Sequence, residues 1–199
     1  MNNKHNNIIS RTLDDHIKLF CCMKNDRQFI CDTQRAAEIV LDSIRTGGAV
    51  YFCGNGGSAA DSQHIATEFV SRFYMERRAF NAEALTVNTS SLTAIGNDYS
   101  FDRVFERQLE AKCRPGDVLI GISTSGLSNN VINALDFAVR HDVRTILLTG
   151  NRTVEKEYDC IIAVPSEDTP RIQEAHICVG HMIAEYVEYI ITGESANDR

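Results

Sequence analysis

The chain lacks the sequence features of membrane and nucleic-acid-binding proteins. No apolar segment approaches the ~18 residues that a membrane span needs. The 20 lysines and arginines form no basic run, and the formal net charge is −7. We therefore expect neither a membrane nor a nucleic-acid partner, although a local site can still concentrate an anionic ligand.

Paired cysteine motifs and a signal peptide are also missing. The seven cysteines are odd in number and show no C-x-x-C spacing, which disfavours a disulfide framework. They look like reduced, mostly buried thiols, and the first residues, MNNKHNN, are polar. A cytoplasmic location is the resulting expectation.

The length and composition suit one domain. The 199 residues are 43% hydrophobic, enough for a core that folds without disulfides. We divide residues 1–199 into an N-terminal helical pair over 1–47, an α/β core over 48–192 and a tail over 193–199. The pair, expected as antiparallel helices over 8–24 and 28–46, needs a surface to pack on, either its own sheet or a partner subunit.

Short apolar runs alternate with helical patterns through the rest of the chain. Strands are expected at 49–53, 83–87, 117–122, 144–148 and 160–164. Helices are expected from Ser58, around 88–98 as a short turn, and at 101–112, 129–141 and 169–191. This alternation predicts an open, doubly wound parallel sheet whose ligands collect at the carboxyl ends of the strands.

The stretch YFCGNGGSAADSQHIATEFVSR, residues 51–72, combines a strand, a glycine turn and a helix. Glycines let the backbone approach a ligand, and a helix start offers unpaired N–H groups to an anion. Within the helix, His64, Glu68 and Arg72 recur every four residues and share one face. The alternatives are a turn kept for packing and a solvated surface pair.

A second turn of the same design follows the expected strand at 117–122. Ser123, Thr124, Ser125 and Ser128 surround Gly126 just before a helix. One serine would be explained as a helix cap, but four hydroxyls favour a phosphate.

The last expected helix begins at Thr169 and Pro170, a capping residue followed by proline. It carries Gln173, His176 and His181 along a largely apolar sequence. Either histidine alone could be a buried core residue rather than a functional one.

Five motifs stand in a fixed order along the chain: GNGGS, H-x-x-x-E-x-x-x-R, GND, STSG-x-S and RIQE-x-H-x-x-x-x-H. Together they resemble the sugar isomerase (SIS) superfamily, and more closely its phosphoheptose isomerases. The resemblance implies a three-layer α/β/α sandwich around a five-stranded, flavodoxin-like parallel sheet. It also implies aldose–ketose isomerisation of sedoheptulose 7-phosphate to D-glycero-D-manno-heptose 7-phosphate through an enediol. That reaction would begin nucleotide-activated heptose synthesis for lipopolysaccharide or capsule.

The same resemblance implies roles for individual residues. The residues expected to contact the phosphosugar are Asn55, Gly56, Gly57, Ser58, Arg72, Asn97, Asp98, Ser123, Thr124, Ser125, Ser128 and Gln173. The residues expected to hold zinc are His64, Glu68, Gln173 and His181, and the expected catalytic pair is Glu68 with His181. Related members are tetramers with sites near subunit boundaries, so a homotetramer is expected here.

Two features of the last expected helix differ from what the resemblance implies for these residues. Pro170 stands where some members carry an acidic residue, which puts one sugar contact in doubt. Gln173 and His181 are eight residues apart, about 12 Å along a helix axis, so both reach one metal only by extending toward each other.

Two other functions stay open at this point. A regulatory SIS protein would bind a sugar phosphate or a protein partner without chemistry, but such relatives tend to lack the equivalents of Glu68 and His181. An isomerase or lyase of another phosphosugar is the second alternative, because nothing in the sequence itself measures the carbon number of the substrate.

Overall fold

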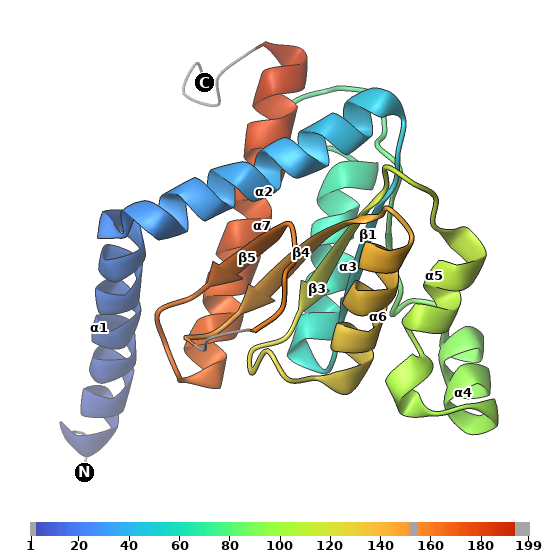
Figure 1. The fold of residues 1–199 in the computed structure, drawn as a ribbon. Helices are drawn as coiled ribbons and strands as arrows, with labels where there is room; N and C mark the ends of the chain where they lie inside the picture. The colour runs from blue at the N-terminus through green and yellow to red at the C-terminus, as the bar shows by residue number, and fades with distance from the viewer. Residues whose placement is uncertain (1–2, 152–154, 194–199) are drawn as a thin grey trace.

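A central parallel sheet organises the chain. The computed structural model describes residues 3–151 and 155–193 (Figure 1). Its strands are β1 (Val50–Gly54), β2 (Ala82–Ala84), β3 (Val118–Ile122), β4 (Arg144–Thr149) and β5 (Cys160–Ala163). They lie in the order β2-β1-β3-β4-β5, and every neighbouring pair is parallel. The predicted α/β class and five-stranded parallel sheet are confirmed.

Helices cover both faces of this sheet. They are α1 (Asn3–Asn25), α2 (Arg27–Thr46), α3 (Gly57–Val70), α4 (Thr89–Asp98), α5 (Glu106–Lys112), α6 (Asn129–Arg140) and α7 (Thr169–Thr192), with a 3₁₀ turn at Phe101–Arg103. Helices α2, α3 and α7 share one apolar core with the sheet, and α5 and α6 share a second core on its other face. The result is the expected three-layer sandwich.

The strand residues alternate between these two cores. Phe52 and Ile120 belong to the core with α2, α3 and α7, whereas Tyr51 and Leu119 belong to the other. Every residue of β1 and β3 is buried, as expected for parallel strands covered on both faces. The strand order places a topological switch point beside β1 and β3, so a ligand site is expected at their carboxyl ends.

The two N-terminal helices do not form the predicted antiparallel pair. Only Asp26 separates α1 from α2, and its carboxylate caps α2 by accepting from the N–H groups of Gln28 and Phe29. A single residue is too short for a helical hairpin, which needs about two to five. Helix α1 therefore turns away at a steep angle and stands beside the body of the protein (Figure 1).

Three local expectations were also wrong. The helix expected over 101–112 is broken, since the 3₁₀ turn ends at Arg103, α5 begins only at Glu106, and the buried residues Val104 and Phe105 lie between them. Asp168, not Thr169, occupies the N-cap position of α7, although its side chain makes no capping hydrogen bond, and Thr169 is the first helical residue. The cysteines are less buried than expected, since Cys21, Cys22 and Cys31 are exposed.

Within residues 3–151 and 155–193, no helix combines the length and apolar character that a membrane-spanning helix requires.

Candidate active site

The glycine turn after β1 is held to the start of α6 by two amides. The Asn55 side chain donates to Oδ1 of Asn130 at 2.8 Å, and Asn130 donates back to Oδ1 of Asn55 at 2.9 Å. Asn130 is buried. Sequence analysis missed its role, because its partner lies 75 residues away. The pair fixes the β1 turn beside the serine turn, so the two expected anion-binding segments share one end of the sheet.

Gln173 lies over the backbone of this first turn. A Cβ atom at Gly57 would clash with the amide of Gln173, so any side chain there would displace that amide. Ser58, the next residue of α3, is buried. The structure thus brings Gln173 to the first turn of α3, where it was expected beside a sugar. Its role as a metal ligand stays a prediction.

Close packing of α3 against α7 assembles the next part of the site. A Cβ atom at Gly180 would clash with the Ile65 side chain, which shows how closely the two helices approach there. This contact brings His181 against His64, with their Nε2 atoms 2.8 Å apart. Oε1 of Glu68 lies 3.5 Å from Nε2 of His64.

His64, Glu68 and His181 form a compact group of metal-binding side chains. One ligand atom from each lies within 4.8 Å of the others. Two imidazoles and one carboxylate are a donor set used by catalytic zinc sites that leave a position open for substrate. The group is also accessible, since the His64 side chain is 51% exposed and that of Glu68 17%. These three residues therefore fit a divalent metal.

A further acid, which sequence analysis did not single out, lies one turn before His64. Burial raises the pKa of the Asp61 carboxyl to about 6, and the neighbouring His64 opposes the shift. Oδ2 of Asp61 is buried without a hydrogen-bond partner in the described part of the chain. Asp61 therefore takes up a proton at a higher pH than an ordinary carboxyl group does.

The serine turn after β3 leaves the start of α6 open. Ser128 precedes the helix, but its hydroxyl makes no cap and instead lies 3.0 Å from Oγ of Ser123. Ser125 Oγ accepts from the N–H of Leu127 at 3.2 Å. No side chain caps α6, and the N–H of Val131 donates to the carbonyl oxygen of Ser128. The N–H groups of the helix that precede Val131 are therefore the ones available to an anion, together with the positive end of the helix dipole.

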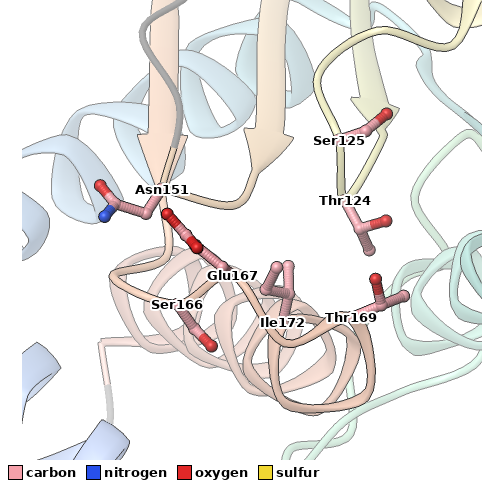
Figure 2. A pocket seen from close by; sticks show the side chains of 7 residues that line it. All are labelled: Thr124, Ser125, Asn151, Ser166, Glu167, Thr169 and Ile172. Carbon is pink, nitrogen blue, oxygen red and sulfur yellow. The ribbon is translucent and has the colours of Figure 1, made fainter.

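A pocket of about 450 Å³ lies next to this turn. Figure 2 shows its walls, which come from the segments after β3 and β4, the loop between β5 and α7, and the first turn of α7. The lining residues are Thr124, Ser125, Asn151, Ser166, Glu167, Thr169 and Ile172. Only Thr124 and Ser125 were predicted as site residues. The others follow the end of a strand or lie near the start of α7. The position of Asn151 just after β4 could have identified it as a site residue, because ligands bind at the carboxyl ends of parallel strands.

His176 is the histidine of α7 that belongs to the core. It is fully buried, and its Nε2 lies 3.2 Å from the carbonyl oxygen of Thr149. Burial lowers the pKa of His176 to about 4, with the bond to Thr149 opposing the shift. The imidazole is therefore neutral near pH 7 and packed inside the protein, which leaves His181 as the functional candidate on this helix.

Three predicted contacts are not gathered with the rest. Asn97 and Asp98 end α4, are exposed, and bond to each other at 2.8 Å. Arg72 is exposed and pairs with Glu76 at 3.8 Å. Among the described residues, none of the three makes a hydrogen bond to the histidine cluster or to the serine turn. Their roles as sugar contacts stay predictions.

Known proteins match this chain over most of its length. A family model described as the SIS domain matches residues 30–150. The phosphoheptose isomerase of Clostridium acetobutylicum is 52% identical over 175 residues, which are 87% of this chain and 89% of that protein. The phosphoheptose isomerase of Burkholderia pseudomallei is 43% identical over 196 residues, 98% of this chain and 100% of that protein.

A solved structure matches the fold as well. The phosphoheptose isomerase of Neisseria gonorrhoeae superposes with a TM-score of 0.86 at 39% identity, over 93% of this chain and 99% of that one.

Proposed function

This chain belongs to the phosphoheptose isomerases of the SIS domain family, and we therefore propose that it converts sedoheptulose 7-phosphate to D-glycero-D-manno-heptose 7-phosphate. The carbon number and stereochemistry come from the family, since the pocket geometry does not measure the length of a sugar. We also propose that the product enters nucleotide-activated heptose synthesis for lipopolysaccharide or capsule, in the cytoplasm, where the chain's free thiols persist.

One observation carries the catalytic proposal. Helices α3 and α7 bring Glu68 and His181, which are 113 positions apart in sequence, to the same imidazole of His64. A protein that only binds a sugar phosphate has no need for a carboxylate and two imidazoles at one point. An aldose–ketose isomerase needs such groups, because a proton must leave one carbon and reach its neighbour.

The proposed steps use these side chains as acid and base. The Glu68 carboxylate takes a proton from C1 of the ketose, and the electron pair forms the C1–C2 double bond of an enediol as the C2 carbonyl oxygen accepts a proton from His181. Return of a proton from Glu68 to C2, with loss of the C1 hydroxyl proton to His181, gives the aldose. Atoms and electrons balance without an oxidant.

The metal expected in this family has a fitting set of ligands here. His64, Glu68 and His181 would hold a zinc ion through one atom each, and Gln173 is proposed as a fourth ligand. The second carboxylate oxygen of Glu68 and the second ring nitrogen of His181 would then take and give the proton. When bound, zinc supplies Lewis acidity that polarises the sugar oxygens. His64 has no other task in the proposed steps, so it serves to hold the metal and to orient His181.

The phosphate is proposed to bind at the serine turn. Replacing Ser123 and Ser128 together by alanine should raise KM about a hundredfold or more, because each of the two hydrogen bonds to a charged group contributes about 1.5–3 kcal/mol. Steady-state kinetics should show kcat nearly unchanged, since the turn does not touch the reacting carbons. A collapse of kcat with KM unchanged would move the phosphate to another part of the site.

A homotetramer is proposed from the exposed apolar surface of α1. Ile9, Leu13 and Ile17 recur every four residues along one side of this helix and are 64%, 58% and 62% exposed. Such a stripe on the solvent-facing side of a helix is typical of a subunit interface. A tetramer with sites near its boundaries would also give Arg72, Asn97 and Asp98 a site on a neighbouring subunit.

Light scattering tests this assembly. The wild-type protein should have the mass of four chains at micromolar concentration, and Leu13→Asp with Ile17→Asp should reduce it. A monomeric wild type would contradict the proposal. The exposed pair Lys18 and Asp15 on the same helix offers a control, since Lys18→Ala should leave the mass unchanged.

A substrate panel tests the proposed reaction against its alternatives. Sedoheptulose 7-phosphate should be turned over with a higher kcat/KM than hexulose or pentulose phosphates. A preference for a shorter ketose would assign the chain to another phosphosugar. Binding of every sugar phosphate without turnover, with metal supplied, would favour a regulatory protein.

A further inference from the structure

The segment that follows α3 is folded around one buried carboxylate. Glu188 of α7 is 1% exposed. Its carboxylate accepts hydrogen bonds from the backbone N–H groups of Phe73 (3.0 Å), Tyr74 (2.5 Å) and Met75 (2.8 Å). It also accepts one from the Nε–H of Arg77, at 3.1 Å. A charge this deeply buried is tolerated only when it is paired and fully hydrogen-bonded, and these four donors meet that requirement.

Arg77 extends this arrangement to the end of α3. Its guanidinium donates to the carbonyl oxygens of Glu68, Phe69 and Ser71, at 2.6, 2.9 and 3.1 Å. The last carbonyls of a helix have no partner within the helix, and a cation there also meets the negative end of the helix dipole. Arg77 therefore caps the last turn of α3, which carries the Glu68 carboxylate.

The same segment places an aromatic ring on the other catalytic candidate. The Phe73 ring stacks on the His181 imidazole, with centroids 5.4 Å apart and planes 27° apart. His64 meets the imidazole of His181 edge-on, with an interplanar angle of 65°. His181 is thus held between Phe73 and His64, and the N–H of Phe73 is one of the groups that Glu188 binds.

We propose that Glu188 and Arg77 form a clamp that positions the active site: it fixes the helical turn of Glu68 and holds Phe73 against His181. Neither residue touches the reacting atoms. The proposal rests on the proposed function for its consequence, because the two groups that it positions are the proposed acid, base and metal ligands. Partners that orient metal ligands typically change metal affinity by about 10–100-fold when mutated.

A matched pair of buried carboxylates separates positioning from mere stability. Asp117 is also buried and also accepts hydrogen bonds from backbone N–H groups, those of Ala49 and Arg114, at 2.8 Å each. It lies at the amino end of β3, opposite the site. Glu188→Gln and Asp117→Asn remove the same charge at constant shape, so both should lower the unfolding temperature.

The ring protons of His181 report the geometry directly. In the wild type they should be shifted upfield by the Phe73 ring, and nuclear magnetic resonance should show that shift diminish in Glu188→Gln but persist in Asp117→Asn. Titration with zinc against a chromophoric chelator should show affinity about 10–100-fold weaker in Glu188→Gln alone. If Glu188→Gln leaves the chemical shifts of His181 and the zinc affinity unchanged, Glu188 contributes only to stability and the proposal is overturned.

A second pair keeps the test decisive if Glu188→Gln does not fold. Phe73 is only partly buried, so Phe73→Leu should fold, remove the ring, weaken zinc binding and lower kcat with little change in KM. Phe73→Tyr keeps an aromatic ring and should show the zinc affinity, the kcat and the His181 chemical shift of the wild type. Equal behaviour of the two variants would overturn the proposal.

Failure of the proposed function is distinguishable from failure of the clamp. A wild type that turns over no sugar would still show the upfield shift of the His181 ring protons and its loss in Glu188→Gln.

Discussion

Glu68→Gln should lower kcat by about 10²–10⁴, the usual contribution of a general base. Glutamine keeps the shape of the side chain but cannot accept the proton from C1, whereas the phosphate contacts after β3 are untouched. Binding of sedoheptulose 7-phosphate, measured by calorimetry, should therefore change only a few-fold. Glu76 provides the control, since it lies eight residues further on and is almost fully exposed. Glu76→Gln should leave kcat unchanged.

In Glu68→Gln, loss of the base must be distinguished from loss of the metal. Zinc content should be measured in the assayed sample, because Glu68 is also a proposed ligand. Low kcat in a sample that retains zinc identifies the base. Full turnover by Glu68→Gln would contradict the assignment and leave the acid–base role to another group, of which Asp61 is the nearest acid in α3 with a pKa of about 6.

His64→Ala should remove the metal and nearly all activity. His64 supplies one of the three clustered donors, so its loss should weaken zinc binding by more than the ~10–100-fold expected for an outer partner. Elemental analysis of dialysed protein should find the metal in the wild type and little in the variant. Excess zinc should restore part of the turnover to His64→Ala but none to Glu68→Gln, because only the latter lacks the base.

A histidine away from the cluster controls for nonspecific effects. His141 follows α6 and stacks on Phe137, at 3.9 Å between centroids. His141→Ala should keep both zinc and activity. Full activity of rigorously metal-free wild-type protein would contradict the metal site altogether, whatever His64→Ala does.

The sequence predicted the fold well where local patterns were strong. Buried apolar runs at β1, β3 and β4, each followed by a helical pattern or a loop, sufficed for the parallel sheet, and the resemblance to the SIS family and to an enzyme is confirmed. The direction of α1 was not predictable from periodicity. It depends on the absence of a loop between α1 and α2, where Asp26 was available as a cap and nothing longer intervened.

Predictions for the site were limited by contacts between distant positions. The spacing of His64 and Glu68 on one helix is local, so it was visible in the sequence. Glu188 was not, because an acid near the end of a helix looks like a solvated surface group until the donors 111–115 residues away are placed. The separation of Gln173 from His181 was visible too, but only the structure shows that Gln173 packs against Gly57.

The central claim is that Glu68 and His181 move a proton between adjacent carbons of a phosphosugar. Incubation of the wild-type protein with sedoheptulose 7-phosphate in deuterated water tests it most directly. A side chain that holds the transferred proton exchanges it with solvent, so deuterium should appear at C2 of the heptose 7-phosphate product, as read by mass spectrometry and nuclear magnetic resonance. If the sugar phosphate binds in the presence of zinc but gains no deuterium and forms no aldose, the proton-transfer roles of Glu68 and His181 are contradicted.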